Sequence, residues 1–178
     1  MTDLATLPWP PAPIGTDRLV LREPEPRDRT AVVELLTSAE VNTYLGGPRP
    51  LDEIARTLPG APEPRPGLFV VDLGGTMIGQ VMLTENKGQR SLAAGRAELG
   101  YLFLPHAWGH GYAAEACTAA LAWFDGALPA EPVVLATQTA NLRSMRLAAK
   151  LGFVEAERFE AWGAAQWLGV RAPAAASR

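Results

Sequence analysis

The stretch ELGYLFLPHAWGHGYAAEA, residues 98–116, decides how the chain folds. An apolar run typical of a strand, residues 97–104, leads into Gly109 and Gly111, and an alanine-rich helical pattern continues from Gly111 to Phe124. Glycines between a strand and a helix let backbone N–H groups approach an anion, and the N-terminus of a helix carries about half a positive charge. The stretch therefore predicts a phosphate site, although such glycines also form ordinary turns.

Strand patterns dominate the chain before this stretch. Residues 68–72 and 77–83 are β-rich runs on either side of Gly74 and Gly75, and a Gly-Gly pair between such runs is typical of a tight antiparallel hairpin. The other elements expected here are a strand at residues 18–22, a helix that Asp28 caps and that carries Val32 to Leu36, and a short helix at residues 52–58.

The chain after the stretch begins with an apolar strand, residues 133–137. A helix follows, for which Asn141 is a good N-cap, Lys150 is a cation in the last turn and Gly152 suits the left-handed position beyond the end. Two closing strands at residues 153–161 and 166–170 are expected to form a hairpin around residues 162–165.

Antiparallel hairpins followed by a β-α-β crossover indicate the fold class. We expect an α/β (α+β) domain with a mixed, mostly antiparallel, strongly twisted sheet of about six to seven strands, flanked by about four helices. The single domain should span residues 14–171. Residues 1–13 contain four prolines and residues 172–178 read APAAASR, so both are expected to be flexible tails.

Composition excludes several classes of function. The formal net charge of the 178 residues is −3, which lacks the basic excess that attracts nucleic acid. The chain has no run of about 20 apolar residues and no basic start followed by an apolar run, so we expect a cytoplasmic protein without a membrane span. Cys117 is the one cysteine, and it and the two histidines, His106 and His110, do not make a metal site.

Four segments resemble one enzyme family in the same order and spacing. The window from His106 to Gly111 is similar to the acyl-CoA signature Q/R-x-x-G-x-G/A of the GNAT superfamily, with His106 at the first position. The form W-G-x-G-Y-A looks most like the branch that contains the ribosomal-protein N-terminal acetyltransferases. The segments Thr16–Arg22, Asn141–Ser144 (N-x-x-S) and Lys150–Phe153 (K-L-G-F) are similar to that branch, so the resemblance covers residues 14–171.

The resemblance implies an N-acetyltransferase that uses acetyl-CoA and no metal. The pantetheine arm would lie along residues 102–104 like an added strand, and the pyrophosphate would meet the backbone of residues 109–114. His110 stands where the family commonly has Arg or Lys, which makes the phosphate site less positive. The cofactor-binding residues implied in this way are Leu102, Phe103, Leu104, Gly109, His110, Gly111, Tyr112, Ala113, Ala114, Asn141 and Ser144.

Acetylation of an amine needs a neutral amine, a stabilised oxyanion and a proton for the departing thiolate. Glu98 is the candidate base, directly or through water, because it begins the strand that should splay beside the cofactor; it can also be an ordinary surface carboxylate. Ser144 is the candidate donor to the sulfur. The tyrosine proposed as the acid elsewhere in the superfamily has no clear counterpart, since Tyr44, Tyr101 and Tyr112 all precede the Asn141 helix.

Other interpretations remain open at this stage. The sequence from Gly109 to Ala114 also fits the dinucleotide motif G-x-G-x-x-A of an oxidoreductase, but the next strand ends in Gln138 instead of an acidic residue. A GNAT-fold module that binds acyl-CoA without turnover is a third hypothesis. The expected partner is an amine, either a small molecule or a protein N-terminus, and a homodimer is compatible with the sequence.

Overall fold

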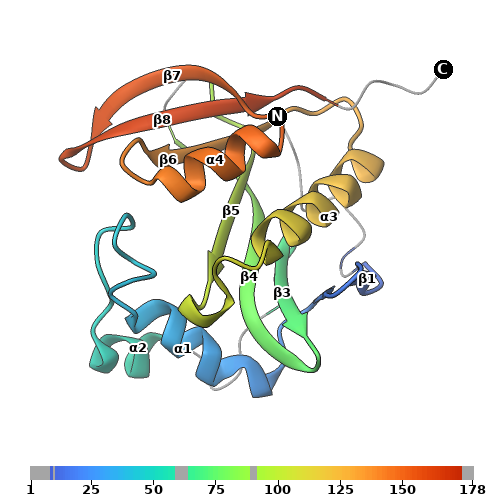
Figure 1. The fold of residues 1–178 in the computed structure, drawn as a ribbon, viewed down its shortest axis with the longest axis vertical. Helices are drawn as coiled ribbons and strands as arrows, with labels where there is room; N and C mark the ends of the chain where they lie inside the picture. The colour runs from blue at the N-terminus through green and yellow to red at the C-terminus, as the bar shows by residue number, and fades with distance from the viewer. Residues whose placement is uncertain (1–8, 10, 59–63, 89–91, 174–178) are drawn as a thin grey trace.

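One sheet of eight strands, in the order β1-β2-β3-β4-β5-β6-β8-β7, organises the protein (Figure 1). The computed structural model describes residue 9 and residues 11–58, 64–88 and 92–173. The strands are β1 (Ile14–Gly15), β2 (Val20–Arg22), β3 (Leu68–Leu73), β4 (Thr76–Glu85), β5 (Ala97–Phe103), β6 (Val133–Gln138), β7 (Val154–Ala161) and β8 (Ala164–Arg171). The helices are α1 (Arg29–Thr37), α2 (Leu51–Thr57), α3 (Tyr112–Ala127) and α4 (Leu142–Lys150), with 3₁₀ turns η2 (Pro26–Asp28) and η3 (Pro105–Ala107).

Neighbouring strands are antiparallel throughout, except that β5 and β6 are parallel. This confirms the predicted mixed, mostly antiparallel sheet. The expected six to seven strands were too few, because Ile14 and Gly15 pair with β2 and form the short strand β1. The chain can turn back so early because the Thr16 N–H donates to the Leu19 carbonyl, at 2.9 Å.

The side chains of β5 alternate between two cores, as the pleat of a strand requires. Leu99 and Phe103 belong to the larger core, which includes Phe124 of α3 and residues of α4. Leu102 packs against the smaller core, which includes Leu35 of α1. Helices α3 and α4 therefore cover one face of the sheet and α1 covers the other.

The helix α4 begins and ends as the sequence predicts. Asn141 is its N-cap, and its side-chain oxygen accepts from the Ser144 N–H at 3.2 Å. Lys150 is its last residue, and Gly152 adopts φ +84°, in the left-handed region that glycine tolerates best. The closing hairpin is tighter than expected, because β7 and β8 extend until only Trp162 and Gly163 separate them.

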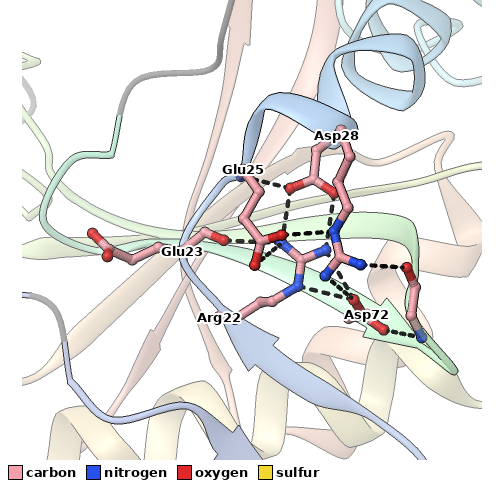
Figure 2. A network of polar contacts seen from close by, with 7 residues as sticks. Arg22, Glu23, Glu25, Asp28 and Asp72 are labelled. Carbon is pink, nitrogen blue, oxygen red and sulfur yellow. Dashed lines mark hydrogen bonds and ion pairs between the residues drawn. The ribbon is translucent and has the colours of Figure 1, made fainter.

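Asp28 corrects one local prediction. It precedes α1, but its side chain makes no capping bond to that helix. Both carboxylate oxygens instead accept from the Arg22 guanidinium, at 2.8 and 2.9 Å, and one also accepts from the Glu25 N–H at 2.7 Å. Figure 2 shows that the same guanidinium reaches Asp72 of β3, to whose carboxylate Arg22 Nε donates at 2.9 Å. The carboxylate thus ties β2 to the start of α1.

This network is buried. The side chains of Arg22 and Asp28 are 9% and 2% exposed. The hydrogen bond to Asp28 raises the pKa of the Arg22 guanidinium. Burial alone would raise the pKa of Asp28, but hydrogen bonds from Arg22 and from the Glu25 N–H bring the pKa below its ordinary value. Arg22 and Asp28 therefore both stay charged near neutral pH, which makes the loss of either one costly.

Part of the chain before residue 14 contacts the core. The Trp9 ring meets Phe69 and Trp123 edge-on, with ring centroids 5.1 and 5.9 Å away. Residues 1–8, 10 and 174–178, which make up most of the two predicted tails, lie outside the described residues. Among the helices that are described, none has the length and apolar character needed to cross a bilayer.

We expect Arg22→Met to lower the free energy of unfolding by about 3–5 kcal/mol, because it removes the cation bonded to the buried Asp28 and leaves Asp72 with only the more distant Arg27, at 3.6 Å. Urea denaturation measures this loss. The matched control is Arg56→Met, whose ion pair with Asp52 joins side chains that are 71% and 74% exposed. The control should change stability by less than about 1 kcal/mol, and equal losses in the two variants would show that the Arg22 network adds nothing.

Candidate functional site

The strands β5 and β6 separate after two residue pairs. Ala97 pairs with Val133 and Glu98 pairs with Val134, but no later residue of either strand pairs across, although β5 runs to Phe103 and β6 to Gln138. Each strand stays paired on its other side, β5 with β4 and β6 with β8. The hydrogen-bond ladder is therefore open beyond Glu98, which is the splay that the sequence predicts.

The open side of β5 offers backbone groups to an extended ligand. The Leu104 N–H donates to the Ile78 carbonyl of β4 at 2.9 Å. Because such bonded pairs alternate along an antiparallel ladder, Leu102 also turns its backbone groups toward β4, while Tyr101 and Phe103 turn theirs toward the open side. Of these, the Phe103 carbonyl already accepts from the Trp108 indole, at 2.8 Å. Within the predicted segment of residues 102–104, Phe103 is the residue whose backbone faces the opening.

The start of α3 presents unpaired backbone donors. Gly111 is its N-cap with φ +80°, Gly109 has φ +81°, and no side chain caps the helix. The first intrahelical bond runs from the Glu115 N–H to the Gly111 carbonyl, at 3.1 Å. The N–H groups of residues 112–114 thus have no partner within the helix, which is the arrangement that binds phosphate groups.

Glu115 fastens this helix to the start of the chain. One of its oxygens accepts from the Thr16 hydroxyl at 2.6 Å and from the Arg18 N–H at 2.9 Å. The other accepts from the Arg18 guanidinium, at 2.6 and 2.7 Å. The Thr16 bond and those from Arg18 together lower the pKa of Glu115, so this carboxylate is ionised near neutral pH.

Arg18 also holds the glycine turn itself. Its guanidinium donates to the His110 carbonyl at 2.9 Å and lies over the Tyr112 ring, 4.6 Å from the centroid. The His110 ring stacks on the same Tyr112 ring, with the two ring centroids 5.5 Å apart. A second cation approaches from α4, where the Arg143 guanidinium lies 4.8 Å from the centroid of the Trp108 ring. Arg18 and Arg143 thus flank the glycine turn, whose own residues include His110 but no arginine or lysine.

Ser144 lies at the opening from the side of α4. Its hydroxyl is 2.5 Å from the Tyr101 hydroxyl of β5, and the residue is 8% exposed. Burial raises the pKa of Tyr101 to about 12, against a smaller lowering by the Ser144 hydrogen bond. Asn141 and Ser144, which the sequence places together, are joined through the Ser144 N–H.

Glu98 lies at the base of the opening, where the pairing of β5 with β6 ends. It accepts from the Asn86 side-chain amide at 2.6 Å. Burial raises the pKa of Glu98 and outweighs the lowering that this hydrogen bond causes. A carboxylate with a raised pKa is a stronger base than a surface carboxylate, so the side chain has the environment that its predicted role requires.

The predicted residues gather around the opening, with three additions. Arg18 was used only as part of a family resemblance, and its contact with the glycine turn joins residues far apart in sequence. Arg143 lies inside the N-x-x-S segment but carried no role. Tyr101 was set aside because it precedes the Asn141 helix, whereas the fold brings it to Ser144.

Cys117 is buried, and burial raises its pKa, as expected of a packing residue.

Other parts of the sequence interpretation can be compared with the structure. Among the described residues no three His, Cys, Asp or Glu side chains are grouped as metal ligands. The alternating dinucleotide-binding fold is built on parallel strands, whereas β5 with β6 is the single parallel pair among the described residues. The sheet therefore disfavours the oxidoreductase hypothesis.

Comparisons with known proteins agree on one family. A family model described as an acetyltransferase (GNAT) domain matches residues 18–154. No curated protein sequence matches the chain. Among solved structures, a GNAT-family acetyltransferase from Bacillus anthracis has a TM-score of 0.72 and 22% identity, over 90% of this chain and 98% of that one.

Two further solved structures share the fold. An acetyltransferase from Salmonella typhimurium that modifies the N-terminal serine of a ribosomal subunit protein has a TM-score of 0.66 and 15% identity, covering 90% of this chain and 98% of its own. AAC(6')-Ib, solved with ribostamycin and coenzyme A, has a TM-score of 0.65 and 16% identity, covering 88% and 94%. At such identities these structures show the fold alone.

We expect Gly111→Ala to destabilise the protein by about 1–2 kcal/mol, because alanine is strained at φ +80°. The matched control is Gly126→Ala, at the other end of α3, where an added Cβ meets nothing within 4 Å and φ is not positive. The control should raise stability by up to about 1 kcal/mol. Thermal unfolding compares the two variants, and a loss in both would point to general sensitivity of α3.

Proposed function

Because the chain belongs to the GNAT acetyltransferase family, we propose that it transfers an acetyl group from acetyl-CoA to a primary amine, by direct attack in a ternary complex. The observation that carries the proposal is the opening between β5 and β6 beside the uncapped start of α3. A strand edge and a helix N-terminus at one place suit a ligand that has an amide-containing arm and a pyrophosphate.

The residues at the opening fit acetyl-CoA. The backbone groups of Tyr101 and the N–H of Phe103, whose carbonyl already accepts from Trp108, would bond to the arm, with Leu102 and Leu104 beside it. The N–H groups of residues 112–114 would receive the pyrophosphate, which Gly109 and Gly111 can approach without a Cβ. Arg143 adds positive charge near this turn, where His110 stands in place of the Arg or Lys common in the family. Arg18 holds the turn through the His110 carbonyl, while its own charge is paired with Glu115. Bound acetyl-CoA supplies the thioester that the amine attacks.

Glu98 is the proposed base. It removes a proton from the attacking amine, directly or through a water molecule, and its raised pKa favours this near neutral pH. The demand on the base depends on the substrate. An α-amine with a pKa near 7.7–8.0 is about one-tenth neutral at pH 7, whereas a lysine side chain near 10.4 is neutral in about one molecule in 2,500.

The proposed acceptor is a primary amine of one of two classes. The similar structures include an enzyme that modifies an N-terminal serine and one solved with ribostamycin, so both a protein N-terminus and a small-molecule amine are acceptors to test. The second candidate function is an acyl-CoA-binding module without turnover. It predicts the same cofactor contacts, and only an acceptor assay separates the two.

The first experiment is titration calorimetry with acetyl-CoA and, separately, with NADH. We expect acetyl-CoA to bind at micromolar strength and NADH not to bind. Release of free thiol is then followed with a peptide that has a free N-terminus, with the same peptide blocked at its N-terminus, and with a polyamine and an aminoglycoside. Binding with amine-dependent release supports the transferase, binding without release supports the module, and binding of NADH alone contradicts both.

Glu98→Gln tests the base. We expect kcat to fall by about 100-fold with a lysine-type acceptor and by about tenfold with an α-amine, because general-base catalysis contributes most where the amine is mostly protonated. The control is Glu34→Gln, an exposed carboxylate on α1, which should leave kcat unchanged. An equal and small loss with both acceptors would remove Glu98 from the mechanism.

A further inference from the structure

A half-buried tyrosine and a buried serine meet at the opening through their hydroxyls, and the sequence assigned a role only to the serine. Tyr101 comes from β5 and Ser144 from the first turn of α4, and their oxygens are 2.5 Å apart. Among the described residues, Tyr101 is the one group that bonds to the Ser144 hydroxyl. This contact joins β5 to α4 at the opening.

The direction of this hydrogen bond follows from acidity. Either oxygen can be the donor in principle. A phenol is a stronger acid than an aliphatic alcohol, so the favoured arrangement has Tyr101 donating and Ser144 accepting. The Ser144 hydrogen then remains free to be donated elsewhere. In the opposite arrangement Ser144 would donate its hydrogen to Tyr101 and would have no other hydrogen to donate.

Tyr101 and Glu98 lie on opposite faces of β5. Tyr101 packs against the larger core together with Leu99 and Phe103, on the face that α3 and α4 cover. Glu98 is an odd number of residues away along the strand, so its side chain projects from the other face. A base on one face and a pair of hydroxyls on the other suit a reaction in which the amine and the leaving group lie on different sides of the thioester carbon.

We propose that Tyr101 is a positioning residue that donates to the Ser144 hydroxyl and thereby directs the Ser144 hydrogen toward the cofactor's sulfur. The inference rests on the proposed function. In the transfer, the amine lone pair forms the C–N bond and Glu98 takes the amine proton. The C–S bond breaks and its electron pair stays on sulfur, which leaves a thiolate. The Ser144 hydroxyl donates a hydrogen bond to this thiolate, and Tyr101 polarises that hydroxyl.

The pair acts as a hydrogen-bond donor and not as the source of the final proton. The pKa of Tyr101 is about 12, so the phenol stays protonated across the physiological range. An ordinary thiol has a pKa of about 8.5, so proton transfer from Tyr101 to the thiolate would run uphill. The thiolate takes its proton from water after it leaves the pair, and the hydroxyls stabilise its charge until then.

Binding of free coenzyme A tests this without any acceptor. Hydroxyls that stabilise a thiolate should make CoA bind more tightly as the pH rises from 7 to 9, relative to S-ethyl-CoA, whose sulfur cannot ionise. We expect this ratio of affinities to rise by about tenfold in the wild type, by about twofold in Tyr101→Phe, and not at all in Ser144→Ala. S-ethyl-CoA should bind Tyr101→Phe as it binds the wild type, which shows that the site is folded.

The double variant separates a positioning role from an independent one. If Tyr101 acts through Ser144, adding Tyr101→Phe to Ser144→Ala causes no further change in CoA binding or in kcat. In the single variant Tyr101→Phe, kcat should fall by about tenfold while KM for acetyl-CoA stays within about twofold. Thr57→Val, which removes an exposed hydroxyl from α2, is the control and should match the wild type.

The outcomes distinguish this inference from the function on which it rests. A wild type that transfers acetyl groups, but whose preference for CoA over S-ethyl-CoA does not change with pH, overturns the inference and leaves the transferase intact. An additive effect of the two substitutions overturns it as well. Failure of the wild type to bind both acetyl-CoA and CoA contradicts the proposed function, and the role of Tyr101 with it.

Discussion

The limited pairing of β5 with β6 is the constraint on which the site depends. Two residue pairs hold these strands together, and each strand is then directed by its other neighbour, β4 or β8. Because β4 pairs with β5 along seven residues and β8 with β6 along six, neither strand can bend back to close the ladder. The open edge is thus stabilised by the rest of the sheet, and its unpaired backbone groups remain available to a ligand.

The short N-terminal segment stabilises this arrangement through two arginines with different tasks. Arg22 is buried and joins β2, β3 and the start of α1. Because water does not reach its guanidinium freely, the carboxylates of Asp28 and Asp72 must balance its charge. Arg18 is half exposed and joins the chain start to Glu115 and to the glycine turn. The Arg22 contacts hold β2, β3 and the start of α1 together. The Arg18 contacts hold the glycine turn in the conformation in which Gly109 and Gly111 have positive φ.

Local signals were read correctly from the sequence, and contacts between distant segments were not. The caps of α4, the Gly74–Gly75 hairpin and the glycine turn depend on residues close together, so their patterns predicted them. Asp28 was misread because its position suits a cap, and the sequence does not show that Arg22 competes for its carboxylate. Tyr101 was missed because order along the chain was taken as a guide to proximity, although a twisted sheet places β5 beside α4.

The two faces of β5 explain why one strand can serve both halves of the proposed reaction. Strand geometry alternates side chains, so residues three apart, such as Glu98 and Tyr101, necessarily lie on opposite sides. Burial raises the pKa of both groups, but with opposite consequences: the carboxylate becomes a better proton acceptor, and the phenol becomes a donor that does not ionise. Partial burial on the two faces of one strand thus produces a base on one face and a fixed hydrogen-bond donor on the other.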